Sequence, residues 1–301
     1  MSKPKKGTLL NRNTAFDRVN YFVMVILAFV MVYPLWYCIA GSLNEGIDYI
    51  RGGVFLWPRK WTLANYKAVF LDKAILNAFG VTILKCLIGT VTSVLCTAMA
   101  SYAITRPGLK LKKLYIPFIM LTMFFSGGLI PYFILIVDLN QYDSFWVYII
   151  PTMFSAYNMI IIQSFMRDLS AELIESAKLD GASEYRIFFQ IILPLSKPVL
   201  ATIALFTVVT HWNSYFDSMM YTSSQELQTI QLFLKKVITD PSVSRGLGSA
   251  ATIAIPDQAA TLTPQVVKLA TMVVTALPVV CIYPFLQRYF VKGVTMGAVK
   301  G

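Results

Sequence analysis

Polar side chains gather in one stretch of an otherwise apolar segment, the residues THWNSYFDSMMY that begin at Thr210. Four of them follow the i, i+3, i+4, i+7 spacing that places side chains on one face of a helix: His211, Ser214, Tyr215 and Ser218. Asn213 and Asp217, spaced i, i+4, form an adjoining strip. Polar groups are costly to bury in apolar surroundings, so this face either lines a polar pathway or bonds neighbouring helices together.

The sequence gives no sign of catalytic chemistry. His211 is the only histidine, and Asp217, six residues later, falls on a different helical face, so the two do not begin a triad. There is no CxxC, HxxxH or HExxH spacing for a metal ion and no GxxxxGKS/T phosphate loop. We therefore predict that the chain is not an enzyme, holds no metal or cofactor and does not hydrolyse ATP by itself.

The composition predicts a membrane protein that crosses the bilayer several times. Hydrophobic residues make up 56% of the chain and charged residues 14%, whereas soluble domains are about 25% charged. The four cysteines lie inside apolar runs, which predicts small buried side chains rather than disulfides.

Six segments are long and apolar enough to cross a membrane as helices, which satisfy their own backbone groups in lipid. They are residues 20–42, 77–104, 112–137, 144–166, 198–221 and 266–290. The predicted fold is an all-α membrane protein with six transmembrane helices. Its parts are an N-terminal segment 1–19, a transmembrane domain 20–292 and a C-terminal tail 293–301.

Lysine and arginine in the connecting segments predict the orientation. With the N-terminus in the cytosol, the inside segments carry 16 basic and six acidic residues, and the outside segments 43–76, 138–143 and 222–265 carry eight of each. Both termini and segment 167–197 are then cytosolic. Topology and contact with membrane lipid explain the formal charge of +11, and no nucleic acid is needed. Segments 43–76 and 222–265 are predicted either as docking surfaces or as solvated connectors.

Lysines also fall within the predicted second and sixth spans. Lys85 and Lys268 are expected near the outer interface, where their side chains reach water, and neither is expected to act as a buried counter-ion. In the third span, the glycines at 127 and 128 followed by Pro131 predict a locally distorted helix. In the fourth span, Asn158 is a further candidate for lining a pathway.

A charged segment, ESAKLDGASEYRIFFQIILPLSKP, separates the fourth and fifth spans. Residues 168–179 are predicted to form a short helix capped by Ser170, and Gly181 follows where a left-handed residue is wanted. A second helix is predicted from Ser183 to Pro194. Its apolar residues, which we expect to pack on the ends of the membrane helices, are Ile187, Phe188, Ile191 and Ile192. This shape suits the transmission of a push from a soluble partner.

The spacing in this segment resembles the EAA loop of binding-protein-dependent ABC importer permeases. Glu-Ser-Ala starts at Glu175, Gly181 follows after three intervening residues, and Ile191 precedes Leu193-Pro194 at the family's spacing. Ser176 departs from the family, where alanine is common. The resemblance implies a coupling helix that docks on a separate ATPase subunit through Glu175, Ser176, Ala177, Asp180, Gly181 and Ala182.

The resemblance covers nearly the whole chain and implies the type I importer permease fold. The tail GAVKG is similar to a permease C-terminus that inserts between the two ATPase subunits, which would assign that role to Gly297, Ala298, Val299, Lys300 and Gly301. The stretches FFSGGLIPYF, ILPLSKPVLATIALF and HWNSYFD resemble the branch that imports lipo-oligosaccharides, aldouronates and other complex oligosaccharides.

The implied assembly lies in the cytoplasmic membrane of a prokaryote. Its partners are a second, related permease, two ATP-binding subunits that hold ATP and magnesium, an extracytoplasmic solute-binding protein and an oligosaccharide. Under this interpretation the substrate path is lined by His211, Asn213, Ser214, Tyr215, Asp217 and Asn158.

The alternative is a secondary transporter or channel that uses an ion gradient. Within the predicted spans, Asp217 is the only carboxylate, and the sequence shows no inverted repeat, both of which disfavour ion coupling. The source of energy distinguishes the two hypotheses.

Overall fold

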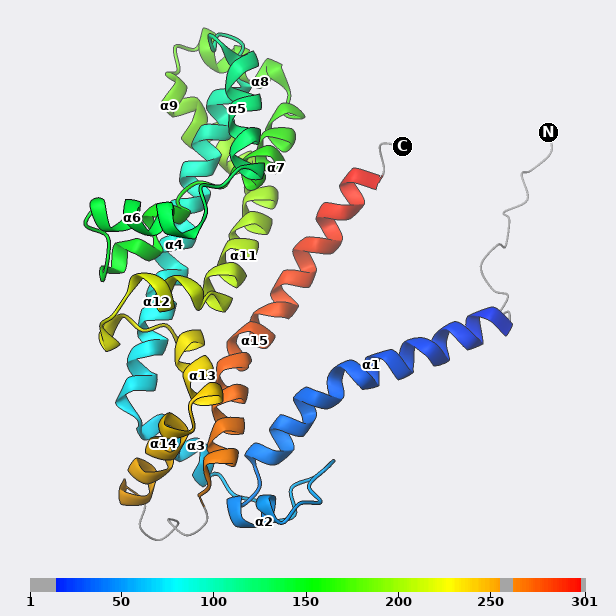
Figure 1. The fold of residues 1–301 in the computed structure, drawn as a ribbon. Helices are drawn as coiled ribbons and strands as arrows, with labels where there is room; N and C mark the ends of the chain where they lie inside the picture. The colour runs from blue at the N-terminus through cyan, green and yellow to red at the C-terminus, as the bar shows by residue number, and fades with distance from the viewer. Residues whose placement is uncertain (1–14, 255–261, 299–301) are drawn as a thin grey trace, which may run out of the picture. The chain divides into compact units, whose positions relative to one another are not determined.

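The computed structural model describes residues 15–254 and 262–298, and these residues fold into helices (Figure 1). The chain divides into two compact units, Met1–Val69 with Ser244–Val273, and Phe70–Val243 with Val274–Gly301. The predicted all-helical class is confirmed, and the single isolated β-bridge of the described residues joins Asn44 to Trp61.

In the first unit, hydrogen bonds of buried polar side chains fold the segment after the first helix. This unit holds α1 (Ala15–Ser42) and α2 (Gly46–Ile50) and the start of α3 (Ala64–Leu71). The Asn65 amide donates to the carbonyls of Ser42 and Asn44 at 2.7 and 2.9 Å. Arg59 pairs with Asp48 at 3.0 Å. Segment 43–76 is therefore an ordered structure rather than a loose connector.

The second unit is built on α4 (Lys73–Thr105), against which α7 (Ala156–Arg167) and α11 (Lys197–Asn213) pack. The side chain of Asp72 caps α4 by accepting from the Ala74 N–H at 2.7 Å. Small residues let α11 approach α4 closely. A Cβ atom on Gly89 would lie 2.6 Å from Nε2 of His211, so only glycine fits there without a shift of the imidazole.

The remaining helical elements are short, except for the last. They are α5 (Lys112–Phe124), α6 (Leu129–Asp138), η1 (Phe145–Tyr148), η2 (Ile150–Thr152), α8 (Ala171–Leu179), α9 (Glu184–Ile187), the π-helical η3 (Phe188–Ile192), α10 (Leu193–Leu195), α12 (Phe216–Tyr221), η4 (Gln225–Leu227), α13 (Ile230–Thr239), α14 (Pro241–Ala254) and α15 (Pro264–Ala298).

Three helices are long and apolar enough to cross a membrane on their own: Phe16–Ser42, Lys73–Thr105 and Pro264–Ile282. Three bent helix pairs pass the same test, which gives up to six spans in the described residues. One pair, α5 with α6, bends by 112°. Gly128 has a positive φ of 86° at this break, so the distortion predicted for the third span is confirmed.

The prediction of one continuous helix over 198–221 is wrong. α11 ends at Asn213, Ser214 is extended, and α12 begins at Phe216. The side chains of Ser214 and Asp217 hydrogen-bond to each other, and such local bonds compete with the helical pattern. The proposed single face of His211, Ser214, Tyr215 and Ser218 therefore does not form.

Segment 222–265, which could have been an unfolded connector, contains helices in its described residues. α13 buries Ile230, Phe233 and Val237. Hydrogen bonds to Asp143 fix the start of the segment. The Asp143 carboxylate accepts hydrogen bonds from the N–H groups of Ser223 and Ser224, both at 2.9 Å, and from the Ser224 hydroxyl at 2.5 Å. These bonds lower the pKa of the Asp143 carboxyl to about 2.

We predict that Asp143→Asn removes the anchor of segment 222–265. The folded carboxyl has a lowered pKa, so its stabilising effect is full above the unfolded pKa of about 4 and is lost as pH falls towards about 2. Amide hydrogen exchange of Ser223 and Ser224, corrected for the intrinsic effect of pH, should lose protection over that range in the wild type and at all pH values in the variant. Asp138→Asn is the matched control. Full protection in Asp143→Asn at neutral pH would contradict this account.

Candidate functional site

The charged segment between α7 and α11 forms a helical hairpin with a glycine turn. Gly181 follows α8 with a φ of 75°, so the predicted left-handed turn is confirmed. The Ala182 N–H donates to the Ala177 carbonyl at 2.9 Å, and the Gly181 N–H to the Lys178 carbonyl at 3.0 Å. These two bonds form a Schellman motif, which closes the end of α8 and reverses the chain. Ser183 then caps α9.

One side of this hairpin is fixed in the apolar core of the second unit. Ile187, Phe188 and Ile192 are buried together with residues of α4, α7 and α11, which confirms that this face packs on the longer helices. Ile191 is partly buried at the edge of the same cluster. Ala177 belongs to the cluster as well, so α8 is attached to the core through its own side chain.

The other side of the hairpin is open. Four of the six residues predicted to contact an ATPase are exposed: Glu175, Ser176, Asp180 and Gly181. Ala177 is buried and Ala182 is half-buried, so these two residues face the apolar core of the second unit. Leu179, which the sequence analysis did not select, is 90% exposed at the end of α8 and adds an apolar side chain to this surface.

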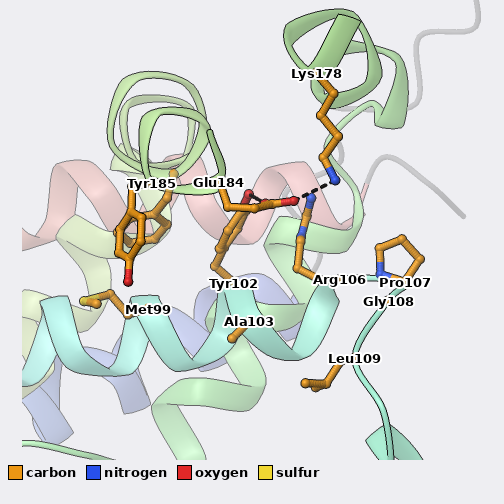
Figure 2. A pocket seen from close by; sticks show the side chains of 11 residues that line it. Met99, Tyr102, Ala103, Arg106, Pro107, Gly108, Leu109, Lys178, Glu184 and Tyr185 are labelled. Atoms are coloured by element: carbon orange, nitrogen blue, oxygen red, sulfur yellow. Dashed lines mark hydrogen bonds and ion pairs between the residues drawn. The ribbon is translucent and has the colours of Figure 1, made fainter. Parts of the chain in front are cut away.

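Polar contacts of Glu184 tie the hairpin to the end of α4. Its carboxylate accepts a hydrogen bond from the Tyr102 hydroxyl at 2.5 Å and pairs with Lys178 Nζ at 2.6 Å (Figure 2). The Arg106 guanidinium lies over the Tyr102 ring, 4.2 Å from its centre. One carboxylate thus joins α8, α9 and α4, and the sequence analysis assigned no role to any of these four residues.

A buried ion pair lies deeper in the same unit. Lys85 Nζ on α4 is 2.7 Å from Asp217 Oδ2 on α12, and the lysine side chain is 0% exposed. The same ammonium lies 4.8 Å from the centre of the Tyr148 ring, and the Ser214 hydroxyl donates to the second carboxylate oxygen. The expectation that the Lys85 side chain reaches water and is not a buried counter-ion is therefore wrong, because the side chain is buried and paired with Asp217.

The other predicted path residues lie in different environments. His211 is buried against Gly89. Asn213 is exposed at the end of α11, and Tyr215 is 39% exposed, with Lys235 Nζ 4.4 Å from the centre of its ring. Asn158 lies half-buried on α7, where its N–H donates to the Ser155 hydroxyl. The structure thus brings Ser214 and Asp217 together and places Asn158 on another helix.

The last part of the predicted site falls at the edge of what the structure describes. Gly297 and Ala298 are the final residues of α15, and Val299, Lys300 and Gly301 lie outside the described residues.

All four cysteines are unpaired, and Cys281 is exposed rather than buried. In residues 15–254 and 262–298, no group of three or more His, Cys, Asp or Glu side chains is placed to hold a metal ion.

Comparisons with known proteins point to one family. Residues 11–296 match the model described as "Binding-protein-dependent transport system inner membrane component". Protein LplC of Bacillus subtilis (strain 168) is 35% identical, with 95% of each chain covered. The polygalacturonan/rhamnogalacturonan transport system permease protein YtcP of the same organism is 33% identical over 96% of this chain and 100% of its own.

A solved structure shares the fold. It is a crystal structure of a bacterial ABC transporter involved in the import of the acidic polysaccharide alginate, and one of its chains matches with a TM-score of 0.86 and 30% identity. The match covers 93% of this chain and 99% of that chain.

We predict that the turn at Gly181 depends on its backbone conformation alone. A Cβ atom there meets nothing within 4 Å, so Gly181→Ala should cost about 1 kcal/mol through the left-handed backbone only. Gly108→Ala is the matched control, because Gly108 has equal space and no positive φ. Hydrogen exchange at the end of α8 reports the change. Equal protection in the two variants would show that the turn needs no glycine.

The ion pair predicts a strongly non-additive pair of substitutions. Lys85→Met or Asp217→Leu alone leaves a buried charge without a partner and should destabilise the protein by about 3 kcal/mol or more. The double variant removes both charges and should recover most of that loss. Thermal unfolding of the purified protein measures both effects. Additive losses in the double variant would mean that the two charges do not stabilise each other.

Proposed function

The chain belongs to the family of binding-protein-dependent transport system inner membrane components, and we propose that it carries an oligosaccharide across the membrane at the expense of ATP hydrolysed by a separate subunit. As a multi-pass component of the inner membrane, it shares the fold of a permease of an ABC transporter. The proposed substrate class rests on the names of similar proteins, which include transporters of rhamnogalacturonan, arabinooligosaccharides and alginate.

The hairpin of α8 and α9 supports the proposal that a separate ATPase supplies the energy. It presents an exposed helix on one side and is buried among α4, α7 and α11 on the other. A partner that moves α8 therefore moves the helices that cross the membrane. We propose that this partner is the ATPase, which binds ATP and magnesium itself, and that Glu175, Ser176, Asp180 and Gly181 face it. The tail from Gly297 to Gly301 is proposed as a second contact.

We assign the remaining partners to surfaces that are exposed in the single chain. Apolar side chains of α1 are mostly exposed, including Phe22, Phe29 and Met31, which fits burial in lipid or against a second permease. Segments 43–76 and 222–265 are proposed to receive the solute-binding protein outside the cell. The N- and C-termini are proposed to lie in the cytosol.

We propose that the substrate passes beside the break between α11 and α12. There Asn213 and Tyr215 are exposed, and an amide and an aromatic ring are groups that bind sugar hydroxyls and sugar C–H faces. The Lys85–Asp217 ion pair fixes α12, which begins at this break, to α4. His211, buried against Gly89, has a packing role in this scheme, and Asn158 is left as a weaker candidate for the path.

The structure weakens the alternative of ion-driven transport. Asp217, the only carboxylate in the predicted spans, already has Lys85 as its partner at 2.7 Å. A carboxylate that couples transport to protons or sodium must release its partner in each cycle, whereas this pair is buried and also bonded to Ser214.

Matched substitutions on α8 test the coupling role. We predict that Glu175→Ala lowers substrate-stimulated ATP hydrolysis and uptake at least tenfold in the reconstituted complex. Glu172→Ala, at an exposed glutamate one turn earlier, should leave both close to wild type. In cells, uptake should stop on depletion of ATP and persist with an uncoupler. Uptake by the purified chain alone, driven by an ion gradient, would support the alternative.

A further inference from the structure

A groove of about 560 Å³ lies between the coupling hairpin and the end of α4. Its walls come from the C-terminal turns of α4, the loop after it and the first residues of α9, as Figure 2 shows. The volume is within the range of sites that bind small molecules, about 300 to 1,000 Å³. Neither the proposed ATPase contact nor the substrate path uses this groove.

Most of the lining is apolar. Met99 and Ala103 line it from α4, Leu109 from the loop and Phe188 from the hairpin. A lining of this kind suits a hydrocarbon chain rather than a polar metabolite. Transfer of apolar atoms from water to such a lining lowers the free energy, whereas transfer of polar atoms without hydrogen bonds raises it.

The polar rim carries a net positive charge. Glu184 is already paired with Lys178, so the uncompensated charge of the lining is that of Arg106. Its Nε atom is buried and has no hydrogen-bond partner among the described residues, while the guanidinium stacks on Tyr102. Lys110 follows in the same loop, Lys112 and Lys113 begin α5, and residues 105–113 contain no acidic residue.

The position of the groove matches the depth of lipid headgroups. α4 has 33 residues and is about 50 Å long, whereas the hydrocarbon core of a bilayer is about 30 Å thick. The end of α4 that bears Tyr102 and Arg106 therefore reaches the headgroup region, on the side predicted to be cytosolic. Basic pockets between membrane helices on that side are suited to anionic headgroups.

We propose that this groove binds one anionic phospholipid of the cytosolic leaflet, with the phosphate on Arg106 and an acyl chain along Met99, Ala103 and Phe188. A guanidinium binds phosphate oxygens with two N–H groups at once, which a lysine does not. Because the site touches α4 and the hairpin together, the bound lipid stabilises the contact through which the hairpin is attached to the membrane helices.

The test uses the full chain, purified with its co-expressed partner subunits and titrated with phosphatidylglycerol or phosphatidylcholine by native mass spectrometry. We expect one saturable binding site for phosphatidylglycerol in the wild type. Binding in Arg106→Gln should be at least about tenfold weaker, because the variant loses a charged hydrogen bond to the phosphate. Lys110→Gln, in the same loop but outside the groove, is the charge-matched control and should bind as the wild type does.

A second variant tests the acyl part without changing charge. Ala103→Trp fills the groove and should weaken phosphatidylglycerol binding, and soluble glycerol phosphate should not displace the lipid from the wild type. Equal losses in Arg106→Gln and Lys110→Gln would reduce the effect to general surface charge and overturn the proposal. Equal affinity for phosphatidylcholine, or full binding by Ala103→Trp, would overturn it as well.

Discussion

The second unit depends on one buried ion pair, between Lys85 on α4 and Asp217 on α12. Either charge alone would be costly inside a membrane protein, so each fixes the place of the other. The pair sits where α11 has ended and α12 begins, and Ser214 completes it. The Tyr148 ring lies beside the ammonium, and its hydroxyl donates to the Leu227 carbonyl at 2.6 Å, which connects the ion pair to segment 222–265.

A single helix, α4, connects this pair to the hairpin of α8 and α9. Lys85 and Tyr102 are 17 residues apart on α4, which corresponds to about 25 Å along the helix axis. Tyr102 binds Glu184 of the hairpin, and the apolar cluster around Phe188 adds contacts with α7 and α11. Under the proposed function, a displacement of α8 by the ATPase would be passed to the ion pair through α4 and not through a flexible loop. This gives the proposed ATP-driven transport a physical route.

Local patterns in the sequence predicted the features that depend on near neighbours. The apolar runs located the candidate spans other than the fifth, Gly181 marked a left-handed turn, and Gly128 marked the bend between α5 and α6. The failures concern residues far apart in the chain. The helical spacing of His211 and Ser214 was read as one face, but Asp217 is drawn to a lysine 132 residues away, and the helix breaks beside it. Lys85 was placed at an interface because its partner is visible only in the folded chain, although a lone lysine and a lone aspartate in separate spans are a usable signal for pairing.

If the hairpin drives transport, the hairpin and the α11–α12 break must move as one body. Spin labels introduced by Glu172→Cys and Asn213→Cys, both at exposed positions, report the distance between them in the assembled complex after Cys38, Cys86, Cys96 and Cys281 are replaced. The reactivity of the Asn213→Cys thiol before labelling confirms that ATP trapping has switched the complex. We expect one narrow distribution of the distance between the two labels, the same with and without trapped ATP. A distance that shifts or broadens when ATP is trapped would contradict it, because the hairpin would then move independently of the helices it is meant to drive.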